Sequence, residues 1–171
     1  WLADLPGQCL ANLHLWVLPN QAFGSGSLVT HVLNEDTLVA STVADGYAEV
    51  YTDFAVHGDG ASRMVLLAGG MAPRRLGRLV QNLLEIETYR MAALLGLPAA
   101  REASAVLASA ERELAELAGA IRSATRESEP ELLDRLTRLA GQVESQHAAT
   151  HSRFSASAAY FELVDKRIGD I

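Results

Sequence analysis

The sequence has few of the residues that mark several large classes of protein. It contains one cysteine, Cys9, so no internal disulfide can form. Before Pro73 there is a single basic residue, Arg63, against seven acidic ones, and the formal net charge of the chain is −7. Because an acidic surface repels phosphate backbones, we expect no nucleic-acid partner for this region. No uninterrupted apolar run reaches the roughly 20 residues that span a bilayer, and no signal-peptide pattern opens the chain.

The residues that are present describe an ordinary globular protein. Of the 171 residues, 49% are hydrophobic and 20% are charged, which excludes a disordered or fibrous chain. This length allows one domain with a real core, or a small domain with a helical appendage. The chain begins at Trp1 and its apolar stripe is still running at Ile171. We therefore expect a fragment of a longer protein, with any targeting or membrane segment outside it.

The first 72 residues have the pattern of a sheet. Apolar and polar residues alternate or form short apolar runs in four segments, 8–17, 37–43, 48–54 and 63–68. Between them lie Gly- and Asx-containing turns at 34–36, 45–46 and 58–60. Because such short links join antiparallel neighbours, we expect an antiparallel sheet. The Gly- and Ser-rich stretch 19–27 is expected to be a surface loop.

From Pro73 onward the apolar spacing changes to steps of three and four, which is typical of amphipathic helices. Pro73 suits a first helical turn, and Gly96 and Pro98 mark its end. A second helix is expected from about residue 99. Ser128 and Glu131 form the pattern of a capping box, in which the Ser128 hydroxyl accepts from the amide of Glu131, so a third helix is expected to start there.

The sequence therefore predicts an α+β fold with an antiparallel β-sheet packed on helices, followed by a long antiparallel helical hairpin of coiled-coil type. The connection at 125–128 is short enough to make the two long helices antiparallel. The corresponding domains are residues 1–98 and 99–171. We expect the aromatic end of the third helix (Phe154, Tyr160 and Phe161) to pack against the first helix or the sheet.

One candidate metal site lies on the third helix. Glu144, His147 and His151 stand at i, i+3 and i+7, so they share one helix face, and two histidines four residues apart can hold a metal. The pattern differs from HExxH, in which a glutamate lies between the histidines, and it names no fourth ligand. Solvated polar positions on an amphipathic helix explain it equally well, and we assign no metal.

Two glycine-containing segments are candidate anion sites. Gly69–Arg75 places two glycines and two arginines, Arg74 and Arg75, where a helix begins, and free amides at a helix N-terminus attract anions. Gly24–Ser27 is the second such segment. Both lack the lysine and hydroxyl of a phosphate-binding loop. The simple interpretation is a turn and a helix start.

Catalytic chemistry is weakly indicated. Glu87 lies near the apolar stripe of the first helix and is either a proton-transfer group with a raised pKa or, as we expect, half of an ion pair with Arg90. We expect Cys9 to be a small buried hydrophobe rather than a catalytic thiol. No GxSxG nucleophile motif is present. The acidic residues of the sheet region match no calcium loop and are expected at hairpin tips and on solvent-facing strand positions; they are Asp45, Glu49, Asp53 and Asp59.

Four segments of the chain resemble a known family. They are Val43–Gly46, Tyr51–Phe54, the long helical signature Gly77–Pro98, and Arg153–Ala156 followed by Ala159 and Tyr160. In these segments the chain is similar to a bacterial family of uncharacterised, membrane-anchored proteins catalogued as domain of unknown function 3422. The resemblance implies a longer polypeptide with further helices and a membrane anchor. It implies no activity and no catalytic residues.

These observations lead to one functional expectation and one alternative. We expect a non-enzymatic portion of a membrane-anchored bacterial protein, cytoplasmic and attached to the inner membrane through segments outside this chain. It is expected to act through protein contacts or self-association of the helical hairpin, with no catalytic residue, cofactor or metal assigned. Polar residues on the helical stripe (Gln146, Thr150 and Ser157) would specify register or partner. The alternative is a soluble domain of a CorA-like divalent-cation transport protein, which is an analogy of architecture only.

Overall fold

The computed structural model describes residues 6–20 and 25–171. Contacts within the chain define two compact units, which we describe separately. The sheet unit comprises residues 1–92 together with 160–171, and the helical unit comprises residues 93–159. The division into domains at residue 98 stays a prediction.

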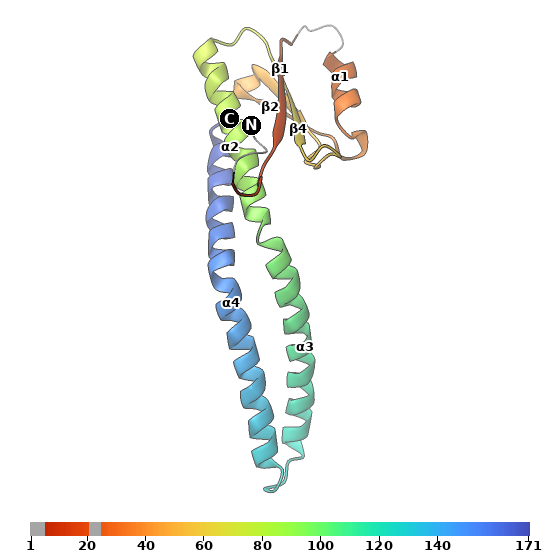
Figure 1. The fold of residues 1–171 in the computed structure, drawn as a ribbon, viewed down its shortest axis with the longest axis vertical. Coiled ribbons are helices and arrows are strands. Elements are labelled where there is room, and N and C mark those ends of the chain that lie inside the picture. The colour runs from red at the N-terminus through yellow and green to blue at the C-terminus, as the bar shows by residue number, and fades with distance from the viewer. Residues whose placement is uncertain (1–5, 21–24) are drawn as a thin grey trace. The chain divides into compact units, whose positions relative to one another are not determined.

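The sheet unit contains one four-stranded mixed sheet (Figure 1). Its strands lie in the order β1-β4-β3-β2. Strand β4 pairs with β3 in antiparallel fashion and with β1 in parallel fashion, and β2 pairs with β3 in antiparallel fashion. The strands are β1 (Leu13–Leu18), β2 (Val39–Val43), β3 (Ala48–Thr52) and β4 (Ser62–Ala68).

The prediction of a purely antiparallel sheet is therefore wrong at one edge. The short turns after β2 and β3 produce antiparallel pairs, as expected. Strand β1 instead lies beside β4, with Leu13 opposite Ser62 and Leu18 opposite Leu67. Two parallel strands need a long crossover, usually helical. The chain between β1 and β2 supplies a helix, α1 (Ser25–Val32).

Helix α1 corrects a second prediction, because Ser25–Ser27 belong to it rather than to a surface loop. Of the rest of that predicted loop, Pro19 and Asn20 are described, and residues 21–24 lie outside the described residues. The helix forms because Val29 and Leu33 are one turn apart and bury against the sheet with Val65 and Leu67. The local Gly/Ser composition carries no sign of this burial.

Strand β4 is covered on both faces, since α1 and α2 (Pro73–Leu94) lie on opposite sides of the sheet (Figure 1). Val65 and Leu67 face α1, whereas Met64 and Leu66 pack with Leu79 and Leu83 of α2. This explains why the segment 63–68 is a continuous apolar run rather than an alternating one.

The long helices begin and end close to the predicted residues. Helix α2 ends at Leu94, α3 spans Leu97–Arg122, and α4 spans Glu129–Gly169. The capping box does not form, because the Ser128 hydroxyl donates to the carbonyl of Thr125 at 2.9 Å and accepts from the Thr125 amide at 3.0 Å. Ser128 thus closes the turn that precedes α4 instead of capping the helix.

The end of α4 returns to the sheet unit. Tyr160 stacks on Tyr89 of α2 with ring centroids 6.2 Å apart, which confirms that part of the aromatic prediction. Arg167 donates from Nε to Glu85 of α2 at 2.5 Å. Phe154 and Phe161 remain exposed.

The helical unit has a small core shared by α3 and α4. Its buried members are Ala110 and Leu117 of α3 and Leu139 of α4, with Leu132 and Val143 packed against them. Elsewhere in this unit, at the start of α3, the hydroxyl of Ser157 donates to the carbonyl of Ala93 at 3.0 Å. A side chain on Gly96 would collide with the Ser157 hydroxyl, so glycine at this position permits the close approach.

By length and composition, the helical run Pro73–Arg122 is the one candidate membrane span in the part of the chain that is described. The same properties occur in core helices of soluble proteins. Two structural features of this run distinguish it from one continuous apolar helix. Leu79 and Leu83 belong to the sheet core, and a turn at Leu95 and Gly96 separates α2 from α3.

We predict that Gly96→Ala lowers the free energy of unfolding by about 1–3 kcal/mol, because the added methyl group overpacks the contact with Ser157. The backbone of Gly96 is in the α region, so strain in φ does not contribute. Chemical denaturation monitored by circular dichroism measures the change. Ser157→Ala in the Gly96→Ala background should recover part of the loss, which a double-mutant cycle quantifies.

Gly141→Ala is the matched control, since a methyl group there meets nothing within 4 Å. It should stabilise the chain slightly through the helix propensity of alanine. Equal effects of the two substitutions would contradict the steric argument.

Candidate anion-binding cavity

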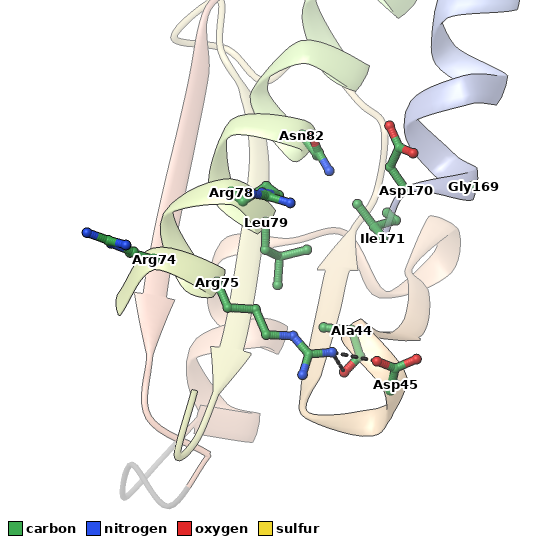
Figure 2. Close-up of a pocket in the computed structure, with 10 residues that line it drawn as sticks. All are labelled: Ala44, Asp45, Arg74, Arg75, Arg78, Leu79, Asn82, Gly169, Asp170 and Ile171. Atoms are coloured by element: carbon green, nitrogen blue, oxygen red, sulfur yellow. Dashed lines mark hydrogen bonds and ion pairs between the residues drawn. The ribbon is translucent and has the colours of Figure 1, made fainter. Parts of the chain in front are cut away.

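The largest described cavity lies in the sheet unit where α2 begins (Figure 2). Its volume is about 530 Å³, within the range of small-molecule sites. One wall is the first part of α2, a second is the turn between β2 and β3, and a third is the end of α4. The lining residues are Ala44, Asp45, Arg74, Arg75, Arg78, Leu79, Asn82, Gly169, Asp170 and Ile171.

Helical spacing places the α2 residues of this wall on one face. Arg75, Arg78, Leu79 and Asn82 follow one another in steps of three, one and three residues, so their side chains project from the same side of α2. Leu79 anchors the face in the sheet core. The polar side chains above and below it are therefore held at fixed positions along the cavity.

Arg75 binds the turn between β2 and β3. Its Nη2 donates to Oδ2 of Asp45 at 2.5 Å and to the carbonyl of Ala44 at 3.0 Å (Figure 2). Its guanidinium also lies 5.0 Å from the ring centroid of Tyr47. Ala44 and Asp45 both have positive φ, 55° and 57°, which is unfavourable for side-chain-bearing residues. The bonds to Arg75 and the bond from the Ala44 amide to the Ile171 carbonyl hold this strained turn in place.

Two arginines and one amide of the cavity are not engaged in this way. Within residues 6–20 and 25–171, no carboxylate forms an ion pair with Arg74 or Arg78. Arg74 and Arg78 both line the cavity, and Arg78 lies between Arg75 and Asn82 (Figure 2). Asn82 is only 8% exposed and lines the cavity. Its amide is directed toward the side of the cavity formed by Asp170 and Ile171.

The wall at the end of α4 carries the carboxylate of Asp170 beside Gly169 and Ile171. Asp170 accepts a hydrogen bond from Nη1 of Arg167 at 3.2 Å. The pKa of Arg167 is raised by its hydrogen bonds to Glu85 and Asp170. The pKa of Glu85 is lowered by hydrogen bonds from Gln81 and Arg167. Arg167 and Glu85 are therefore both charged at neutral pH.

Sequence analysis found only part of this cavity. It singled out Arg74 and Arg75 at the helix start, and the structure places both in the lining of the cavity. It missed Arg78, Asn82 and Asp170. The i, i+3 and i+7 spacing of Arg75, Arg78 and Asn82 was a usable signal, but nothing local links them to residue 170. The other segment, Gly24–Ser27, has Gly24 outside the described residues, and Ser25–Ser27 open α1.

Glu87 and Arg90 form the expected ion pair. Glu87 is 2% exposed, and its carboxylate accepts from Nε and Nη2 of Arg90 at 2.7 and 2.8 Å. Burial raises the pKa of Glu87, but hydrogen bonds from Arg90 and Ser62 and the charge of Arg90 outweigh it, so the net pKa is lowered. Glu87 is therefore an ionised partner of Arg90, and its pKa is shifted in the direction opposite to the one that a general acid needs.

The acidic residues of the sheet region have separate partners. Asp45 pairs with Arg75, Glu49 accepts from the Tyr51 hydroxyl at 2.6 Å, and Asp59 pairs with Arg63 at 3.1 Å. Asp53 is buried, not solvent-facing as predicted. Among the residues that the structure describes, no three His, Cys, Asp or Glu side chains gather in a way that could hold a metal.

Asp53 is held by backbone amides and a histidine that sequence analysis did not single out. Its carboxylate accepts from the amides of Asn34 and Ala55 at 2.9 and 3.1 Å, and it lies 2.9 Å from Nε2 of His57. The Nε2 atom is buried and makes no properly aligned hydrogen bond. Burial raises the pKa of Asp53, but the two amides and His57 outweigh it and lower the net value.

On α4, the rings of His147 and His151 lie 5.5 Å apart between centroids. Both line a cavity of about 250 Å³ in the helical unit together with Gln146, Thr150 and Phe154. Glu144 lies in a different depression, beside Leu136 and Val143. The three candidate metal ligands of the sequence are therefore divided between two surfaces.

Cys9 is exposed, which corrects the expectation of a buried hydrophobe. Strand β1 begins only at Leu13, because its partner β4 begins at Ser62. Residues before Leu13 have no strand to pair with in this sheet, so the predicted strand 8–17 is shortened. The Cys9 thiol donates to the carbonyl of Ala11 at 3.3 Å.

The helical unit exposes an apolar face. Leu107, Leu114 and Ile121 recur every seven residues along α3 and are 43%, 51% and 52% exposed. Leu107 and Leu114 line a groove of about 430 Å³ between α3 and α4, together with Ala110, Glu111, Leu136, Leu139, Ala140, Val143 and Glu144.

Comparison with known families gives one match. The profile of the family described as "Protein of unknown function (DUF3422)" matches residues 1–171. The chain therefore belongs to this family. No curated protein and no solved structure matches the chain.

We predict that Glu87→Gln lowers the free energy of unfolding by about 3 kcal/mol, because it leaves the charge of Arg90 unpaired and partly buried. The folded-state pKa of Glu87 lies below its ordinary value of 4.5. The ion pair thus stabilises the fold at pH above 4.5, and this contribution is lost as the pH falls through the folded pKa. Denaturant unfolding from pH 7 to pH 3 should show the difference between wild type and variant shrinking below pH 4.5.

Glu116→Gln on α3 is the matched control, since Glu116 is exposed and should change stability by less than about 0.5 kcal/mol. A difference between wild type and Glu87→Gln that does not depend on pH would contradict the ion-pair argument.

Proposed function

We propose that this chain is a non-enzymatic portion of a membrane-anchored bacterial protein and that it acts by self-association of its helical unit. The observation that carries the proposal is the seven-residue recurrence of half-exposed Leu107, Leu114 and Ile121 on α3. This spacing is the one that lets one helix pack along another in a coiled coil. Exposure of such an apolar face to water is unfavourable, and its burial against a matching helix lowers the free energy.

The positions that already pack within the helical unit lie beside this face. Ala103, Ala110 and Leu117 also recur every seven residues, and all three are buried. Helix α3 thus carries two parallel apolar stripes. One is buried in the core of the helical unit, and the other, formed by Leu107, Leu114 and Ile121, is exposed to solvent. Leu133 and Leu136 of α4, 65% and 38% exposed, supply further open apolar surface. Two apolar stripes on a helix are typical of a bundle of more than two helices.

A second copy of the chain is the partner that this argument favours. In a two-fold symmetric pair, each copy buries the same surface, so a face that is apolar on one copy meets an apolar face on the other. Completing the burial of one half-exposed leucine contributes about 1 kcal/mol, and five such side chains on each copy provide a substantial driving force. The antiparallel coiled-coil hairpin remains part of the proposal.

Membrane attachment at the cytoplasmic side of the inner membrane is the further part of the proposal. It is supported by the family resemblance and requires no membrane crossing by the run Pro73–Arg122, whose residues Leu79 and Leu83 belong to the sheet core. The non-enzymatic part is supported by Glu87, whose carboxylate is taken up by Arg90. The CorA-like alternative stays a prediction, which calorimetric titration with magnesium and cobalt tests.

We predict that the mass of the 171-residue chain rises with concentration in sedimentation equilibrium and that Leu107→Gln with Leu114→Gln returns it to the monomer mass. Glutamine has a helix propensity close to that of leucine, so α3 should stay helical by circular dichroism. The polar side chains remove the apolar surface without breaking the helix.

Val56→Gln is the matched control, because Val56 is 57% exposed but belongs to the sheet unit. This variant should associate like the wild type. A wild-type mass that stays monomeric from micromolar to near-millimolar concentration would overturn the self-association proposal.

A further inference from the structure

We infer that His147 and His151 of α4 together bind one divalent transition-metal ion, such as Zn²⁺, through their imidazole rings. The two residues are about one helical turn apart, and their ring centroids lie 5.5 Å from each other. Both line the cavity of about 250 Å³ in the helical unit. The inference does not rest on the proposed self-association, because all the residues that carry it belong to one copy of this unit.

The separation of the two rings is close to the one that a shared ion requires. In zinc sites each imidazole nitrogen lies about 2.0–2.1 Å from the metal, and two rings bound with tetrahedral angles have centroids about 5 Å apart. The observed 5.5 Å reaches this value through a small rotation of the side chains. Because one helix carries both rings, the second nitrogen binds the ion as an intramolecular ligand, which strengthens binding.

The surroundings of the pair admit a cation. Both histidines are exposed to solvent, so an ion reaches them without movement of the helices. Among the described residues that line the cavity there is no lysine or arginine, and the α3 side of the lining consists of Ala103 and Leu107. No fixed positive charge in the lining therefore opposes binding, and the formal net charge of −7 favours the approach of a cation.

The donor atoms select the class of ion. Imidazole nitrogen suits Zn²⁺, Cu²⁺ and Ni²⁺, whereas Mg²⁺ and Ca²⁺ prefer carboxylate and carbonyl oxygen. Glu144 lines a different depression, and no third His, Cys, Asp or Glu of the described residues joins the pair. Two nitrogens thus hold the ion, and water occupies its remaining positions. We expect Cu²⁺ to bind more tightly than Zn²⁺, and Mg²⁺ not to bind at this site.

The test is isothermal titration calorimetry of the untagged 171-residue chain with zinc chloride. The tightest site should bind one Zn²⁺ per chain, and an excess of magnesium chloride should not displace it. Electron paramagnetic resonance of the chain loaded with one equivalent of Cu²⁺ should show hyperfine coupling to two imidazole nitrogens. Absence of saturable Zn²⁺ binding, displacement by magnesium, or coupling to a single imidazole nitrogen would each overturn the inference.

The double variant His151→Ala with Ser152→His keeps the number of histidines and changes only their spacing. Residues five apart are separated by about 140° around a helix, so the rings at positions 147 and 152 cannot share one ion. Zn²⁺ binding should weaken by about tenfold or more, because the ion keeps a single imidazole ligand. Both positions are exposed, so the circular dichroism of the variant should match that of the wild type. Wild-type affinity in this variant would overturn the inference.

His14→Ala with His31→Ala is the matched control. Both of these histidines are exposed and belong to the sheet unit. Their removal should change the affinity for Zn²⁺ by less than about twofold, since a twofold change corresponds to only a small free energy. A loss as large as that of the spacing variant would show that Zn²⁺ binds the histidines of this chain irrespective of their position, and would overturn the assignment to His147 and His151.

Discussion

The burial of both faces of β4 is the constraint on which the sheet unit depends. Val65 and Leu66, adjacent residues that point to opposite faces, have no exposed surface. Each face therefore needs its own cover, and α1 and α2 supply it. A helix on the α1 side must lie between β1 and β2 in the chain, and the crossover that contains it brings β1 beside β4 in parallel orientation. The mixed sheet follows from this requirement.

Covering the other face also positions the polar groups of α2. With Leu79 and Leu83 in the sheet core, the helix cannot rotate about its axis without exposing them. Arg75, Arg78 and Asn82 are thereby directed toward the turn between β2 and β3 and the end of α4, where the cavity lies. Further along α2, Glu87 enters the interior, and the bidentate contact with Arg90 keeps its charge compensated there. One amphipathic helix thus carries core, ion pair and cavity wall.

The helical unit buries smaller side chains than the sheet unit does. Its core relies on small residues, since Ala103 and Ala110 are buried on α3 and Gly96 admits the hydroxyl of Ser157. Small residues let α3 and α4 approach closely, but they bury little apolar area themselves. Of the larger side chains of α3, Leu117 is buried, whereas Leu107, Leu114 and Ile121 are left on the open stripe. This distribution is the physical basis for proposing that the unit completes its core by association, while the sheet unit, covered on both faces, has no such need.

The sequence by itself determined what depends on near neighbours: the helix ends at Pro73 and Gly96, the antiparallel hairpins, and the Glu87–Arg90 pair, whose members are three residues apart. It indicated the basic helix start through Arg74 and Arg75, but not the cavity that both of them line. Tertiary structure alone decided the parallel pairing of β1 with β4, the helix at Ser25–Val32, the exposure of Cys9 and the joining of Asn82 with Asp170. These features arise from contacts between residues far apart in the chain, such as Ser62 with Asn12. Local propensity and periodicity carry no record of such contacts, because they are set by which surfaces remain to be buried once the elements have formed.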